Sequence, residues 1–279
     1  MSTHTSDRGT SLLSFDTLVF ILRASLAAVL FMGGVKLAFP GDALGLAAAY
    51  VDPDTGWIAP FFVDQIENRL GMEVHTFLAV QGWLEMAVAV LLALGVRTRT
   101  LAVVAGLMFW AFAVANPVVG EIRLSRDIAL AALSFAVAVG GPGRWTLEGR
   151  LRGWERGEVS DLRKRATLLV VRSGLAFTLI SSALFTSGVM ATHLNQTLPV
   201  VLVLLLGLAL AAGVLPRWAA ALVVLWMLGI VVWGVASSGL LGGLDSTKRE
   251  VGLAAGAFVY ALAGSRDPWV LFPGRRSSS

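Results

Sequence analysis

Long apolar runs, separated by glycine, proline and charged residues, dominate the chain. Each run is rich in Ala, Leu, Gly and Val and lacks the polar residue at every second position that a barrel strand needs. About 20 apolar residues in a helix cross a bilayer while satisfying their own backbone hydrogen bonds. The pattern therefore predicts an all-α membrane protein with eight transmembrane helices, at about 16–38, 75–95, 99–117, 122–141, 167–190, 197–214, 218–239 and 246–264.

Composition strengthens this prediction and excludes several classes of protein. Of the 279 residues, 56% are hydrophobic and only 14% are charged, which excludes an ordinary water-soluble domain. The absence of cysteine excludes a disulfide framework, a thiolate zinc site and a cysteine-ligated iron–sulfur cluster. The histidines lie in the N-terminal tail or near predicted span ends, at His4, His75 and His193. We therefore expect neither haem nor a metal site.

The excess of basic residues predicts the orientation of the chain in the plasma membrane. Lys and Arg give a net charge of +4, and in a membrane protein we interpret this excess as a topology signal rather than as a sign of nucleic-acid binding. Arg97, Arg99, Arg217 and the basic segment 142–166 all fall on one predicted side. That side is expected to be cytoplasmic, with both tails, 1–15 and 265–279, also inside.

The eight segments form two halves with recurring landmarks, 16–141 and 167–264, joined by the basic linker 142–166. The linker is expected either to lie on the inner leaflet as an amphipathic segment or to be a solvated connector. Because an even number of spans separates the halves, the two four-helix units are parallel. The matching landmarks are Leu22-Arg23 with Val171-Arg172, Gly95-Val96 with Gly213-Val214, Arg99 with Arg217, Arg126-Asp127 with Arg249-Glu250, and Gly141 with Gly264.

Glu85 is the charged residue predicted to lie deepest in the membrane. It precedes Gly95 by ten residues, which at about 1.5 Å per residue places it ~15 Å from the inner boundary. An ionised carboxylate there is costly, so we expect it to be protonated, paired or facing a polar cavity. One hypothesis pairs Glu85 with Arg23 of the first span; the alternative gives each a different partner.

Further charges are expected in the outer leaflet. Arg126-Asp127 and Lys248-Arg249-Glu250 lie there if these spans have full length, or in the head-group region if the helices are short. Lys36, near the outer end of the first span, could meet Asp127. The second half has Val203 and Phe185 at the positions of Glu85 and Lys36, so we expect the site mainly in the first half. The alternative is that these charges form structural ion pairs.

A series of short motifs follows in order along the first half: Leu22-Arg23, Gly33-Gly34-Val35-Lys36-Leu37, Gly82-Trp83-Leu84-Glu85, Leu94-Gly95-Val96-Arg97-Thr98-Arg99, Arg126-Asp127 and Gly141-Pro142-Gly143-Arg144-Trp145. In these motifs the chain resembles the DoxX/DoxD family of small four-helix membrane proteins, over residues 16–150. The long first loop, with Trp57 and Pro60-Phe61-Phe62, looks most like the DoxD branch, the small subunit of thiosulfate:quinone oxidoreductase. The second half departs from the pattern and resembles a degenerate copy.

The resemblance implies a membrane subunit that passes electrons from thiosulfate, or a related sulfur substrate, to quinone as the acceptor. Glu85 would be the catalytic residue by donating a proton, and Arg23, Lys36, Arg126 and Asp127 would form the substrate-binding site. Without cysteine or another cofactor motif, electron transfer needs bound quinone beside the substrate or a second redox subunit.

Two other classes of function remain open at this point. The protein is alternatively a non-catalytic membrane anchor or assembly partner of a redox complex, whose basic linker docks a cytoplasmic protein or anionic lipid. The parallel duplication and the midplane charge are also compatible with a small-solute carrier. Membrane lipids are expected partners in every case.

Overall fold

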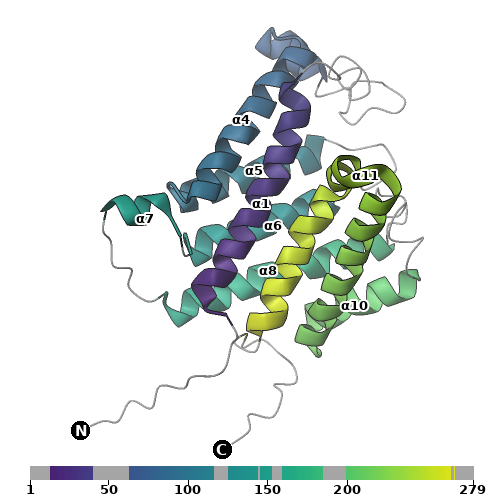
Figure 1. Ribbon diagram of the computed structural model, residues 1–279. Coiled ribbons are helices and arrows are strands. Elements are labelled where there is room, and N and C mark those ends of the chain that lie inside the picture. Colours follow the sequence, from purple (N-terminus) through teal and green to yellow (C-terminus); the bar gives the residue numbers. More distant parts are fainter. Residues whose placement is uncertain are drawn as a thin grey trace, which may run out of the picture.

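The computed structural model describes residues 13–39, 63–115, 125–143, 145–152, 159–184, 199–264 and 267 (Figure 1). These residues form helices and short connections, and no strand occurs among them, so the all-α prediction is confirmed. Four helices, α1, α4, α8 and α11, are long and apolar enough to cross a membrane, and α5 and α10 are shorter apolar helices. The elements are α1 (Phe15–Ala38), the π-helix η1 (Gln65–Arg69), α4 (Val74–Leu94), α5 (Thr98–Ala115), α6 (Ser125–Gly140), α7 (Leu147–Arg152), α8 (Asp161–Leu184), α10 (Val200–Ala212) and α11 (Pro216–Ala263).

The last helix, α11, covers two of the expected segments. The backbone leaves the helical region at Gly239, where φ is 73° and ψ is 172°, and again at Thr247. Glycine tolerates the positive φ because it has no Cβ. The predicted separation of 218–239 from 246–264 therefore corresponds to a break inside α11. The ends of four other expected segments, at 116–117, 122–124, 185–190 and 197–198, lie outside the described residues.

Equivalent positions of the two halves end their second helices in the same way. Gly95 after α4 and Gly213 after α10 are left-handed, with φ of 73° and 69°, and the amide of each donates to a carbonyl of the last helical turn. Two residues further on, Arg97 and Leu215 also have positive φ, 40° and 44°. Both turns are Schellman-type caps followed directly by the next helix.

Helices of the two halves pack against each other reciprocally. The first helix, α1, packs on α4 of its own half and on α11 of the other half, and α8 packs on α10 and on α6 (Figure 1). Small residues allow this close approach: a Cβ on Gly174 of α8 would lie 2.7 Å from the Cβ of Ala132 on α6, and one on Gly252 of α11 would meet Leu130. Leucines of α1, α6 and α8 fill one shared apolar core.

Large apolar side chains cover much of the outer surface. Trp83 on α4, Trp110 on α5, and Trp218 and Trp233 on α11 each have more than half of their surface exposed, among many exposed leucines and valines. Soluble monomers rarely expose apolar surface on this scale, whereas lipid accepts it. Together with the long apolar helices, these faces indicate a protein embedded in a membrane.

Candidate functional site

Two ion pairs join the halves across the α6–α11 contact. Arg126 of α6 pairs with Glu250 of α11, and both side chains are almost fully buried. Arg249 of α11 donates to Asp127 of α6, with Nε 2.7 Å from Oδ1 and Nη2 3.3 Å from Oδ2. The sequence had matched Arg126-Asp127 with Arg249-Glu250 as repeated landmarks. The structure shows that the two dipeptides exchange partners, so that each arginine binds the acid of the other half.

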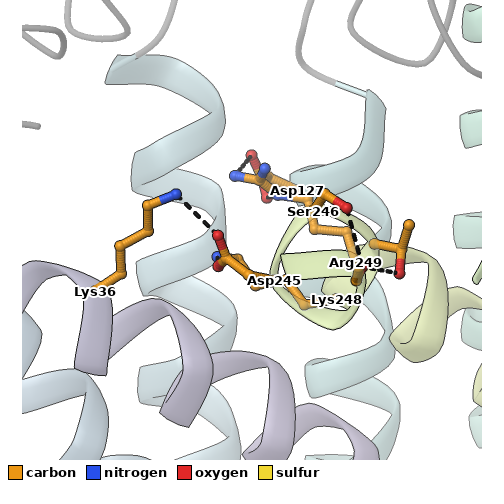
Figure 2. Close-up of polar contacts among 8 residues, drawn as sticks. Lys36, Asp127, Asp245, Ser246, Lys248 and Arg249 are labelled. Atoms are coloured by element: carbon orange, nitrogen blue, oxygen red, sulfur yellow. Dashed lines mark hydrogen bonds and ion pairs between the residues drawn. The ribbon is translucent and has the colours of Figure 1, made fainter. Parts of the chain in front are cut away.

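A third contact links α1 to α11 through one shared carboxylate. Lys36 Nζ lies 2.9 Å from Asp245 Oδ2, and Lys248 Nζ lies 2.6 Å from Asp245 Oδ1 (Figure 2). The side chains of Lys36 and Asp245 are 35% and 36% exposed. The hypothesis that Lys36 meets Asp127 is therefore wrong: Asp245, which the sequence had not singled out as a partner, receives Lys36, while Asp127 receives Arg249.

Glu85 is buried on α4, with only 3% of its surface exposed. Gln81, one turn earlier and partly exposed, donates from Nε2 to Glu85 Oε1 at 3.4 Å. On the α1 side the carboxylate faces Gly33, where an added Cβ would lie 2.9 Å from Oε2. Lys248, Arg249 and Asp127 lie within electrostatic range of Glu85. The expected burial of this carboxyl is confirmed, and a neutral amide is its hydrogen-bond donor among the described residues.

A close crossing of α1 and α4 positions Glu85 beside α1. A Cβ on Gly34 would lie 2.6 Å from the carbonyl oxygen of Gly82, and a Cβ on Gly82 would lie 2.7 Å from that of Gly34. Only glycine at both positions permits this separation of the two backbones. Gly82 precedes Glu85 by about one turn, so the crossing also brings the carboxyl against Gly33.

Arg23 binds backbone carbonyls rather than Glu85. Its guanidinium donates to the carbonyl oxygens of Pro142, of Ala93 at 3.3 Å and of Trp145 at 3.0 Å. The hypothesis of a pair between Arg23 and Glu85 is therefore wrong, and the alternative, that each has a different partner, is confirmed. Arg23 fixes the chain directly after α6 against the ends of α1 and α4, which is a positioning role.

The equivalent arginine of the second half has a similar role. Arg172 of α8 lies 2.9 Å from Asp267, just after the end of α11, and Tyr260 Oη donates to the same carboxylate at 2.8 Å. In each half the arginine of the first helix thus holds the segment that follows the fourth segment of that half. In the second half the buried carboxylate of Asp267 binds the arginine, whereas in the first half backbone carbonyls bind Arg23.

The polar cluster takes its residues from both halves, whereas the sequence led us to expect a site mainly in the first. We define the outer cluster as Lys36, Glu85, Arg126, Asp127, Asp245, Lys248, Arg249 and Glu250. The expectation rested on Val203 and Phe185, which stand where the first half has Glu85 and Lys36. Val203 is buried and apolar, and Phe185 lies outside the described residues. The second half contributes its charged residues through α11 instead.

Charge is nearly balanced within the outer cluster. Its four cations face three carboxylates in ion pairs, and Glu85 is the fourth acid. The Oε2 atom of Glu250 is buried and has no hydrogen-bond partner among the described residues. The cluster is therefore neutral when Glu85 is ionised and carries one positive charge when Glu85 is protonated. No set of three or more potential metal ligands occurs in the described part of the chain.

Comparisons of the chain with models of protein families, with curated proteins and with solved structures find no match. The resemblance to the DoxX/DoxD family consequently remains a prediction from the motifs alone.

Proposed function

We propose that the chain is an integral membrane subunit of a quinone-linked redox system, which passes electrons from thiosulfate or a related sulfur substrate to quinone. The observation that carries the proposal is Glu85: a carboxyl buried in an apolar helix, hydrogen-bonded by the neutral amide of Gln81 and not fixed by an ion pair among the described residues. A carboxyl in such a place can hold a proton and release it, whereas a salt-bridged carboxylate is held ionised.

We further propose eight spans arranged as two parallel four-helix units in the plasma membrane, with both termini in the cytoplasm. The matching caps at Gly95 and Gly213 and the equivalent roles of Arg23 and Arg172 support the duplication. The break in α11 at Gly239 supports the division of that helix into two spans. The basic inner segments support the orientation.

Quinone would accept the electrons, and its reduction also consumes protons. Glu85 supplies a proton-holding group, and Gln81, which is partly exposed, donates a hydrogen bond to it. On the same helix Trp83 is exposed, and its ring lies 5.3 Å from that of Phe39, which offers apolar contacts to a planar ring. These side chains fit a quinone head group near the outer ends of α1 and α4.

The sulfur anion would bind at the exposed part of the outer cluster. Lys36 is partly exposed and shares one carboxylate with Lys248, so this lysine pair is incompletely neutralised. Arg126 and Asp127 are buried in ion pairs, and Arg23 is bound to carbonyls. Of the residues predicted to bind substrate, Lys36 is thus the one that meets the anion, and the other three position the site.

The test compares thiosulfate-dependent reduction of a short-chain quinone by membranes that contain the native chain or Glu85→Gln at equal abundance. We expect activity in the native membranes and a loss of about 100-fold in the variant, the usual contribution of a general acid. Glu73→Gln is the matched control, because Glu73 is an exposed acid at the start of α4 and pairs with His75. Unchanged turnover in Glu85→Gln would remove Glu85 from the reaction.

A second candidate is a non-catalytic anchor or assembly partner, which the mutual pairing of Arg126 with Glu250 and of Arg249 with Asp127 favours. Such pairs fix helix packing without chemistry. In that case Glu85→Gln would lower the amount of inserted protein rather than the turnover per molecule. Thiosulfate counterflow in sealed vesicles without any quinone would instead indicate a carrier.

A further inference from the structure

In the lysine pair of the outer cluster, two cations share a single carboxylate. Asp245 accepts from Lys36 through one oxygen and from Lys248 through the other. Each arginine nearby has an acid of its own, Asp127 for Arg249 and Glu250 for Arg126. The positive charge that remains in the cluster is therefore concentrated at Lys36 and Lys248.

Glu85 is the acid that can balance this charge. The polar and charged side chains that act on it come from three helices: Gln81 from α4 itself, Asp127 from α6, and Lys248 and Arg249 from α11. From α1 the backbone at Gly33 faces the carboxyl directly. Ionised Glu85 makes the whole cluster neutral, whereas protonated Glu85 leaves one full positive charge at the lysines.

We propose that the outer cluster binds a small inorganic anion together with a proton, with the anion between Lys36 and Lys248 and the proton on Glu85. The proton on Glu85 offsets one negative charge of the bound anion, so each favours the uptake of the other. The location of this site rests on the proposed function, but the coupling of anion to proton goes beyond it and does not require quinone.

Asp245 is placed where an anion can displace it. Its side chain is 36% exposed, and it lies between the two breaks of α11 at Gly239 and Thr247. Next to it the hydroxyls of Ser246 and Thr247 donate to the carbonyl of Gly243, an arrangement that bends helices. Asp245 is thus an internal competitor for the anion, held on a segment that departs from regular helix.

The experiment measures binding of radiolabelled sulfate to the purified full chain in lipid nanodiscs, from about pH 5.5 to about pH 8, where Asp245 stays ionised. We expect the native protein to bind sulfate on the order of tenfold more tightly at the acidic end, since one charge in a partly buried site is worth about that factor. Glu85→Gln, which is permanently neutral, is expected to bind tightly at every pH. Failure of the native protein to bind sulfate, or an unchanged pH dependence in Glu85→Gln, would overturn the proposal.

Variants of Asp245 and Lys36 are expected to change the affinity for sulfate in opposite directions, which misfolding cannot imitate. Asp245→Asn removes the internal competitor and is expected to tighten sulfate binding, whereas Lys36→Met is expected to weaken it. Lys164→Met, which removes a lysine paired with Asp161 at the start of α8, is the matched control for a lost lysine. Weaker binding in Asp245→Asn, or binding by Lys36→Met equal to that of the native protein, would contradict the site.

Two controls separate this proposal from its alternatives. His75→Gln removes the exposed imidazole at the start of α4 and is expected to leave the pH dependence intact. Loss of the pH dependence in His75→Gln would assign the coupling to that histidine. If Glu85→Gln loses quinone reduction while sulfate binding is independent of pH in the native protein, the proposed function stands and the coupling is wrong.

Discussion

Removing Arg126 or Glu250 separately should damage the protein more than removing both. The two side chains form an ion pair whose exposed fractions are 6% and 2%, between α6 of one half and α11 of the other. Arg126→Met leaves a carboxylate buried without its cation, and Glu250→Met leaves a buried guanidinium without its acid. The double variant leaves neither charge and fills the space with apolar side chains.

The size of each effect follows from burial. Truncating one partner of a buried pair costs about 3–5 kcal/mol, a large part of the ~5–15 kcal/mol by which folded proteins are stable. For a chain of this length that corresponds to a fall in melting temperature on the order of 5–10 °C. Replacing both partners by apolar residues is often close to neutral, so the double variant should recover most of this loss.

The assay is thermal unfolding of the purified protein in detergent. The quantity measured is the amount of protein that stays monodisperse after heating. The exposed pair of Lys164 with Asp161 is the control, and Lys164→Ala should cost less than about 1 kcal/mol. If the falls in melting temperature of Arg126→Met and Glu250→Met simply add in the double variant, the two residues are not coupled. The Arg126–Glu250 pair then does not join the two halves.

Two further predictions concern packing. Gly34→Ala should lower the melting temperature, because the new Cβ would lie 2.6 Å from the carbonyl oxygen of Gly82. Gly229→Ala should have little effect, because nothing lies within 4 Å of a Cβ there. Equal falls in melting temperature would contradict the close crossing of α1 and α4. Asp267→Asn should destabilise the protein by about 1.5–3 kcal/mol, because Arg172 loses a charged hydrogen-bond partner 2.9 Å away, and a melting temperature equal to that of the native protein would contradict this role.

The helices were predictable because hydrophobic length and glycine breakers are local signals. The expected start and end of the first segment, 16–38, differ from α1 by one residue at most, and the repeated Gly-Val turns became the caps at Gly95 and Gly213. The burial of Glu85 was predictable as well, because a charged side chain in the middle of a long apolar helix needs shelter from lipid.

The partners of the charges were not predictable, because counting along a helix fixes depth but not which neighbouring helix a side chain faces. Arg23 was assigned to Glu85 on depth, yet backbone carbonyls after α6 satisfy it, and carbonyls leave no signature in the side-chain pattern. Lys36 was matched with Asp127 inside its own half. Its actual partner, Asp245, comes from the other half, and only the packing of α1 on α11 brings the two together.

Whether Glu85 exchanges a proton inside the membrane is the most direct test of this account. We would record infrared difference spectra of the full chain in lipid between acidic and alkaline buffer, for the native protein and for Glu85→Gln. The account predicts a protonated carboxyl band in the native spectrum that disappears at alkaline pH and is absent from Glu85→Gln but present in Glu73→Gln. Identical difference spectra for the native protein and Glu85→Gln would contradict it.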